Sequence, residues 1–228
     1  MGDHFYKLLQ PVFSLLWHCH VLDKKNIPLQ GPAVFVSNHL GSYAPIAVLS
    51  AFPVRLYPWV EYEVTDSKLC PEYLRTDFVE PELHLKPPLS QLMAWLISKA
   101  CITVMKALQA IPVHKKSMKM AATWKRSIGL LKQNKLLIIF PENNLIPLND
   151  VMNELDDGFV GLASIYYEKT RRLLSFIPVA VHKTAKAIKI GLPVSYDPEK
   201  EFSVERERIK TALQNRILEM YSSLISTY

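Results

Sequence analysis

The chain has 228 residues, of which 49% are hydrophobic and 10% aromatic, and this composition supports a sizeable core and excludes an intrinsically disordered chain. Its net charge of +6 fits either an anionic partner such as a phospholipid surface or simple solubility, and because the basic residues form no nucleic-acid-binding motif, no nucleic acid partner is expected. Cys19, Cys70 and Cys101 have neither metal-ligand spacing nor an even count, so we expect no metal ion, no disulfide framework and a reducing compartment.

The first predicted element is a helix within residues 1–22. Its apolar residues, from Phe5 to Trp17, fall mostly on one broad side. Two interpretations stay open: the helix packs on the core, or it is an interfacial helix whose aromatic side chains enter a bilayer surface. Gln10 and Pro11 interrupt the run, which therefore falls short of the ~20 apolar residues that a membrane span needs.

The rest of the chain alternates apolar strands with helices. Residues 52–88 are rich in proline and acidic side chains, and they indicate an irregular excursion, of the kind that often forms a lid or binding segment. Strands are expected at 33–37, 54–60, 111–113, 136–140, 173–181 and 186–194, and helices at 44–51, 90–110, 117–133, 158–169 and 203–228. This alternation predicts an α/β fold, a mixed sheet flanked by helices in a single domain over residues 1–228.

A polar turn follows the strand at 33–37 directly. It contains Asn38 and His39, then Gly41 and Ser42. Open α/β sheets bind ligands beyond the carboxyl ends of their strands, and a histidine can accept a proton near neutral pH. The sequence therefore makes His39 a candidate general base, and the alternative is a strand-end histidine satisfied by the backbone.

A second polar turn, Phe140-Pro141-Glu142-Asn143, follows the strand at 136–140. Together the two turns resemble two signature blocks of the glycerolipid acyltransferase family, whose members move a fatty acyl group from a thioester to a lysophospholipid. Weaker matches at 111–115, 157–163 and 177–179 come in the family's order. The resemblance covers roughly residues 30 to 195.

The chain departs from the family's pattern at several positions. The family's first block reads Asn-His-x-x-x-x-Asp, and Ala44 stands where the aspartate would orient the histidine. Lys115 and Leu145 stand where the family has arginines that hold the acceptor's phosphate. A replacement for the aspartate is needed, and the candidates besides a backbone carbonyl are Glu142, Glu61, Glu63 and Asp66.

The resemblance implies an acyltransferase in which His39 is the general base and Glu142 orients it or contacts the acceptor. It implies a substrate-binding set of Asn38, Gly41, Ser42, Lys115, Phe140, Pro141 and Asn143. Backbone amides near 38–42 or 140–143 would hold the oxyanion. The implied donor is an acyl thioester, either acyl-CoA or acyl-carrier protein, and the acceptor is a hydroxyl of a lysophospholipid-like molecule, with no cofactor. Such an enzyme would lie on the cytoplasmic face of a membrane with an anionic surface.

Two other functions stay open. The first is a catalytically silent lipid- or acyl-binding protein of the same fold, which would be indifferent to His39→Ala. The second is a hydrolase in which Ser42 is the nucleophile beside His39. For the acyltransferase, we expect transfer to vanish in His39→Ala and to rise in Ala44→Asp.

Overall fold

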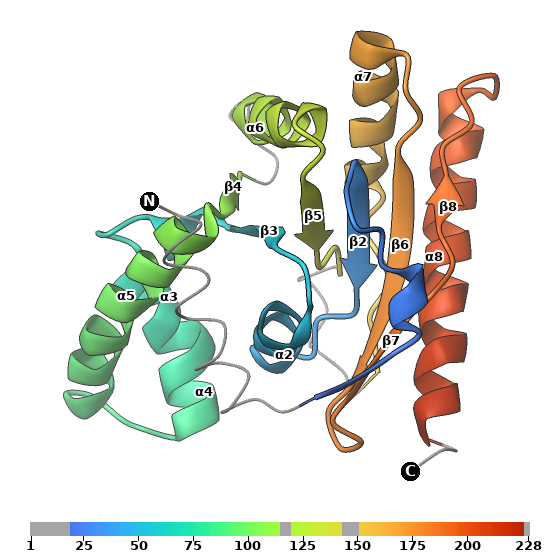
Figure 1. Cartoon of the computed structure of the whole chain (residues 1–228). Helices are drawn as coiled ribbons and strands as arrows, with labels where there is room; N and C mark the ends of the chain where they lie inside the picture. The colour runs from blue at the N-terminus through green and yellow to red at the C-terminus, as the bar shows by residue number, and fades with distance from the viewer. Residues whose placement is uncertain (1–18, 115–119, 143–150, 226–228) are drawn as a thin grey trace. The chain divides into compact units, whose positions relative to one another are not determined.

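The computed structural model describes residues 19–114, 120–142 and 151–225 (Figure 1). Contacts between residues divide the chain into two compact units, one around Tyr57–Thr123 and the other formed by Gln10–Leu56 and Trp124–Tyr228. Each unit is described by itself below. The single domain expected over 1–228 stays a prediction, and of the helix predicted within 1–22 only the end is described, where the chain forms a strand instead.

The larger unit contains a mixed sheet. Its strands are β1 (His20–Leu22), β2 (Ala33–Ser37), β5 (Leu136–Ile139), β6 (Ser175–His182), β7 (Ala187–Ile190) and β8 (Val194–Ser195). The order is β1-β7-β6-β2-β5, with β8 paired to β6. β2 is parallel to both β5 and β6, whereas β6 and β7 are antiparallel. The carboxyl ends of β2, β5 and β6 therefore lie at one edge of the sheet.

Helices flank this sheet, as predicted from the sequence. They are α2 (Tyr43–Ala51), α6 (Met120–Lys132), α7 (Gly161–Thr170) and α8 (Phe202–Ile225), with single 3-10 turns at η1 (Lys24–Asn26) and η4 (Gly158–Val160). Every residue of β2 is buried, which is typical of a parallel strand covered on both faces. Phe52, directly after α2, packs its ring edge-on against Phe35 of β2, with 5.2 Å between the ring centroids. The predicted α/β class, a mixed sheet flanked by helices, is confirmed.

The smaller unit contains the parallel strands β3 (Leu56–Glu61) and β4 (Ile111–Val113). Between them lie η2 (Tyr62–Thr65), α3 (Cys70–Leu74), the π-helical turn η3 (Arg75–Val79), α4 (Glu80–Leu83) and the long helix α5 (Leu89–Leu108). The irregular excursion expected over 52–88 is thus wrong for most of its length. Prolines are tolerated in the first turn of a helix, and Pro71 and Pro81 occupy such positions at the starts of α3 and α4.

α5 is the one helix in the described part of the chain that is long and apolar enough to cross a membrane, although core helices of soluble proteins pass the same test.

Candidate functional site

The turn that carries His39 connects β2 to α2. Leu40 and Gly41 both have positive φ, 47° and 60°, so the chain reverses within two residues after the histidine. A positive φ is uncommon for leucine and is found more often at functional sites than elsewhere. His39 is half-buried, whereas Ser42 is exposed.

Asn38 anchors this turn to the sheet. The side chain is fully buried, and its amide nitrogen donates to the carbonyl oxygens of Val181 and Val151, each at 3.0 Å. Its amide oxygen accepts the main-chain N–H of Val181 at 2.8 Å. The side chain therefore acts like a short piece of strand that continues the pairing of β2 with β6. Its predicted contact with substrate stays a prediction.

Glu142 reaches the same turn from the end of β5. One carboxylate oxygen accepts the main-chain N–H of His39 at 2.7 Å, and the other accepts the main-chain N–H of Asn153 at 3.0 Å. The side chain is only 2% exposed. Burial raises the pKa of this carboxyl above its ordinary value of 4.5, although the two amide donors act in the opposite direction. Glu142 thus holds the backbone of His39 and so positions its side chain.

The imidazole ring of His39 packs edge-on against Phe140, with 5.7 Å between ring centroids and 74° between planes. Pro141 lies between Phe140 and Glu142, and its carbonyl oxygen accepts the main-chain N–H of Asp156 at 2.7 Å. The structure therefore brings together the two turns that the sequence singled out, since residues 38–42 and 140–142 meet at the carboxyl edge of the sheet.

Other predicted residues lie either outside the described residues or in the smaller unit. Lys115, Asn143 and Leu145 lie outside the described residues. Glu61, Glu63 and Asp66 belong to the smaller unit, where the Asp66 carboxylate accepts the main-chain N–H groups of Lys68 and Leu69.

Ala44, at the position of the family's aspartate, is fully buried. It lies in the apolar core with Val48, Phe52 and Ile177. A carboxylate placed there would be surrounded largely by hydrocarbon.

Three neighbours of the turn were not anticipated from the sequence. The main-chain N–H of Asn153 donates to the same Glu142 carboxylate as the main-chain N–H of His39, and no sequence signal marks a main-chain donor. The Tyr43 hydroxyl lies 3.4 Å from the Cys19 sulfur. Burial, and to a smaller extent this contact, raise the pKa of Tyr43 well above its usual range. The Lys183 amine lies 6.0 Å from the centre of the Tyr43 ring and adds a cation near the turn.

The described ranges contain no cluster of three or more His, Cys, Asp or Glu side chains able to hold a metal ion. The arrangement instead combines a half-buried imidazole, a buried carboxylate that holds its backbone, and a turn with successive main-chain N–H groups. Such a site suits proton transfer and the binding of a developing negative charge.

The fold and the edge position of this site define an α/β protein whose candidate site lies at the carboxyl ends of parallel strands. No protein-family model matches the chain, and no curated protein matches it. Among solved structures, it is similar to the 1-acyl-sn-glycerophosphate (LPA) acyltransferase PlsC from Thermotoga maritima, with a TM-score of 0.52 and 15% sequence identity over 94% of this chain and 78% of that chain. This likeness confirms the predicted glycerolipid acyltransferase-like fold.

Proposed function

We propose that the chain is an acyltransferase that moves a fatty acyl group from an acyl thioester, acyl-CoA or acyl-carrier protein, to a hydroxyl of a lysophospholipid-like acceptor. One observation carries the proposal: the Asn38-His39 turn and the Phe140-Pro141-Glu142 turn, which resemble two acyltransferase blocks, are joined by the 2.7 Å hydrogen bond from the His39 amide to Glu142. The fold likeness to an acyltransferase supports the same reaction class.

In this mechanism the His39 imidazole takes the proton of the acceptor hydroxyl as the oxygen attacks the thioester carbonyl carbon. The carbonyl oxygen becomes an oxyanion in the tetrahedral intermediate. When the carbon–sulfur bond breaks, the new ester is released and the thiolate takes the proton from the imidazolium. Glu142 would act as a positioning residue in these steps, because its two oxygens already accept main-chain N–H groups.

The oxyanion would be held by the amides of Gly41 and Ser42. The His39 amide is already committed to Glu142, which makes it a poor choice for this role. Consecutive N–H groups form concavities that favour anions where left- and right-handed conformations follow one another. Gly41 has a positive φ, and Ser42 after it is in the right-handed region. Phe140 and Pro141 would contact the acyl chain, and Asn38 would keep the turn in place.

A second candidate is a catalytically silent lipid- or acyl-binding protein, and the burial of Ala44 in the core favours it. At this position the family has the carboxylate that orients the histidine, whereas the methyl side chain of Ala44 has no hydrogen-bonding group. The predicted hydrolase remains a third interpretation, in which the exposed Ser42 would attack the thioester.

The test is acyl transfer from an acyl-CoA to lysophosphatidic acid or lysophosphatidylcholine, measured by product formation and by thiol release. His39→Ala is expected to abolish both signals, whereas the exposed His84→Ala leaves them unchanged. Product formation without dependence on His39 would refute the proposed general base. Thiol release without any acceptor, lost in Ser42→Ala, would support the hydrolase. Co-purifying lipid without turnover would support the binding protein.

The remaining expectations belong to the same proposal. The enzyme would need no cofactor beyond its thioester substrate, and it would lie on the cytoplasmic face of a membrane with an anionic surface. A lipid acceptor and the net charge of +6 support that location.

A further inference from the structure

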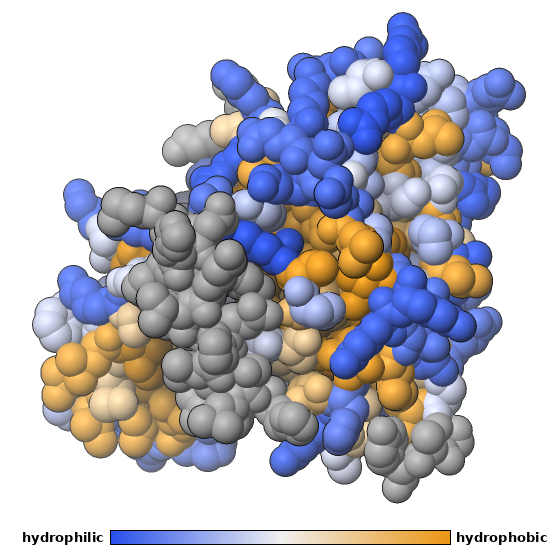
Figure 2. Space-filling view, in the orientation of Figure 1, coloured by the Kyte–Doolittle hydropathy of each residue, from blue (hydrophilic) through white to orange (hydrophobic). Residues whose placement is uncertain are grey.

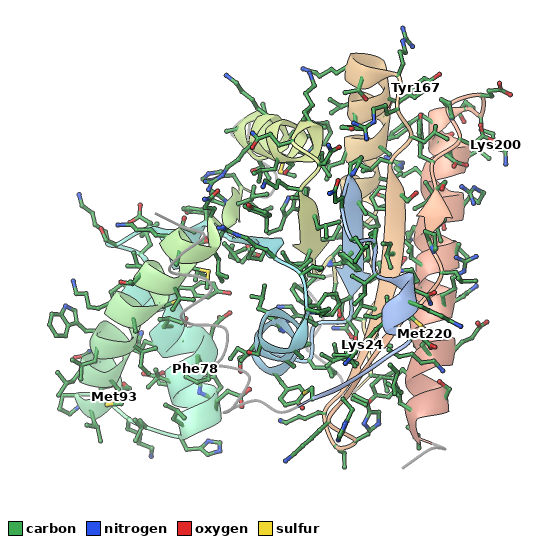
Figure 3. The ribbon with its side chains drawn as sticks, viewed as in Figure 1. Lys24, Phe78, Met93, Tyr167, Lys200 and Met220 are labelled. Carbon is green, nitrogen blue, oxygen red and sulfur yellow. The ribbon has the colours of Figure 1, made fainter. Side chains whose placement is uncertain are left out.

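One face of α5 exposes large apolar side chains. Leu89, Leu92, Trp95 and Leu96 are 50%, 54%, 50% and 49% exposed. Because residues three, four and seven apart lie on the same side of an α-helix, the four side chains share one stripe. Figure 2 shows apolar side chains gathered where Figure 1 draws the N-terminal half of α5, and Figure 3 labels Met93 in the same half.

The same stripe becomes basic in the C-terminal half of the helix. Lys99, Thr103 and Lys106 are exposed there, and α5 contains no acidic residue. The Lys99 amine lies 5.2 Å from the centre of the Trp95 ring, so the cation and the aromatic ring meet where the apolar part of the stripe ends.

The opposite face of α5 is packed within its own unit. Ser90, Ala94 and Ser98 follow one another at helical spacing and are buried, and α5 packs against α3. α3 and η3, which pack against α5, are short and carry charged residues such as Glu72 and Arg75, so they cannot span a bilayer beside it. This arrangement favours a helix that lies in the interface.

We infer that the exposed stripe of α5 is a bilayer-docking surface for anionic membranes, which deepens the proposed function by naming the surface that brings the site to its lipid acceptor. Leu89, Leu92 and Leu96 enter the acyl-chain boundary. Trp95 and Lys99 lie at headgroup level, where amphipathic aromatic rings and long basic side chains are favoured.

The charge on α5 itself fits an anionic surface, whereas the neighbouring η3 and α4 also carry the exposed acidic residues Asp77 and Glu82. Lys86 precedes the helix, and Lys99 and Lys106 are exposed on it. On the neighbouring helices, Glu72 and Glu80 both pair with Arg75, which reduces their repulsion of anionic lipid. Each basic side chain near such a surface contributes about 1 kcal/mol, so several lysines add appreciably to the apolar insertion.

The experiment uses the full chain in a vesicle co-sedimentation assay, with vesicles of phosphatidylcholine alone and of phosphatidylcholine mixed with phosphatidylglycerol. The test variant carries Leu92→Ser and Leu96→Ser. The matched control carries Leu29→Ser and Leu192→Ser, which change two exposed leucines of the larger unit. A third variant carries Lys99→Ala and Lys106→Ala. Circular dichroism melts establish that each variant is folded.

We expect the α5 leucine variant to bind both kinds of vesicle at least about tenfold more weakly, since each inserted leucine adds roughly that factor. The control should bind like the unchanged chain, and the lysine variant should lose only the additional affinity for vesicles that contain phosphatidylglycerol. Equal binding by the unchanged chain and the leucine variant would overturn the inference. A second result would also overturn it: sedimentation equilibrium in which the leucine substitutions convert a dimer to a monomer, with no loss of vesicle binding.

Transfer to a lysophospholipid dispersed in detergent separates this inference from the proposed function. Loss of vesicle binding in the leucine variant with detergent-phase transfer intact supports the docking surface. Vesicle binding by the unchanged chain with no transfer under any condition would remove the proposed reaction and leave the docking surface standing.

Discussion

Replacing Glu142 by glutamine tests the hydrogen bonds that join the two turns. The carboxylate accepts two buried main-chain N–H groups, from His39 and Asn153. A glutamine side chain has one acceptor oxygen, so it can satisfy one donor, and its NH₂ group would face the other. The substitution keeps the size and shape of the side chain while it removes one acceptor and the charge.

The expected cost follows from these bonds. A hydrogen bond to a charged group contributes about 1.5–3 kcal/mol, and a buried N–H left without an acceptor costs about 1–3 kcal/mol. Removing the buried charge offsets part of this loss of stability, because burial disfavours the charged carboxylate. We therefore expect Glu142→Gln to lower the free energy of unfolding by about 2 kcal/mol. Transfer should fall by about tenfold to a hundredfold, since a displacement of about 1 Å in a catalytic group has that effect.

The pH dependence gives a second readout. Because the folded protein raises the pKa of Glu142 above its ordinary value of 4.5, the stability associated with this group is fully present below that value and is lost as the pH rises through the raised pKa. The unchanged chain should lose this contribution as the pH rises from 4.5 through the raised pKa, whereas Glu142→Gln should not. The cost of the substitution is then larger at the acidic end of that range.

The assay is urea unfolding at a series of pH values, with Glu219→Gln as the control because this carboxylate is exposed on α8. The control should change stability by no more than about 0.5 kcal/mol at any pH. If Glu142→Gln unfolds at the same urea concentration as the unchanged chain across the whole range, the carboxylate does not hold the two turns as described.

Three further substitutions are tested by thermal and urea unfolding: two lie beside the site, and the third lies at the opposite, amino edge of the sheet. Ala44→Asp should lower the free energy of unfolding by about 3–5 kcal/mol, because its carboxylate would enter a fully buried apolar core, and any gain in transfer has to be measured below the lowered melting temperature. Asn38→Ala should cost about 2–4 kcal/mol, because it leaves buried main-chain groups of Val181 without partners. Gly31→Ala should cost about 1–3 kcal/mol, because the added Cβ would clash with the carbonyl oxygen of Lys135.

Each of these has a matched control in the described residues. Ala121→Asp adds the same carboxylate at an exposed position near the start of α6, and Asn215→Ala removes an exposed amide. Gly129→Ala adds a Cβ where no atom lies within 4 Å. A test variant that is no less stable than its control would contradict the contact assigned to that residue.

The sequence alone predicted the strands and the two turns well. β2 and β4 begin and end at the predicted residues, 33–37 and 111–113, because a short apolar run bounded by turn residues has few other structures available. The predicted strand at 186–194 is instead the shorter β7, Ala187–Ile190, and a separate strand, β8, begins at Val194. The interval 52–88 was predicted poorly, because proline density was taken to exclude helices that in fact have a proline in their first turn.

The candidate site divides in the same way. His39, Glu142 and their neighbouring residues could be singled out from the sequence, since a buried strand that ends in polar residues is visible in the order of the amino acids. The role of Glu142 could not be read there, because it accepts hydrogen bonds from main-chain N–H groups, one of them 103 residues away. The burial of Ala44 in the core also depends on packing.

The order of residues by itself determined which segments become buried strands and where polar turns follow them, because hydrophobic patterning and turn chemistry act locally. Only the tertiary structure decided that Glu142 holds the backbone of His39 and that Asn38 joins Val181. The physical reason is that nearly every residue carries the same main-chain donor and acceptor, so the partner of a buried side chain is selected by the fold and leaves no trace in the sequence.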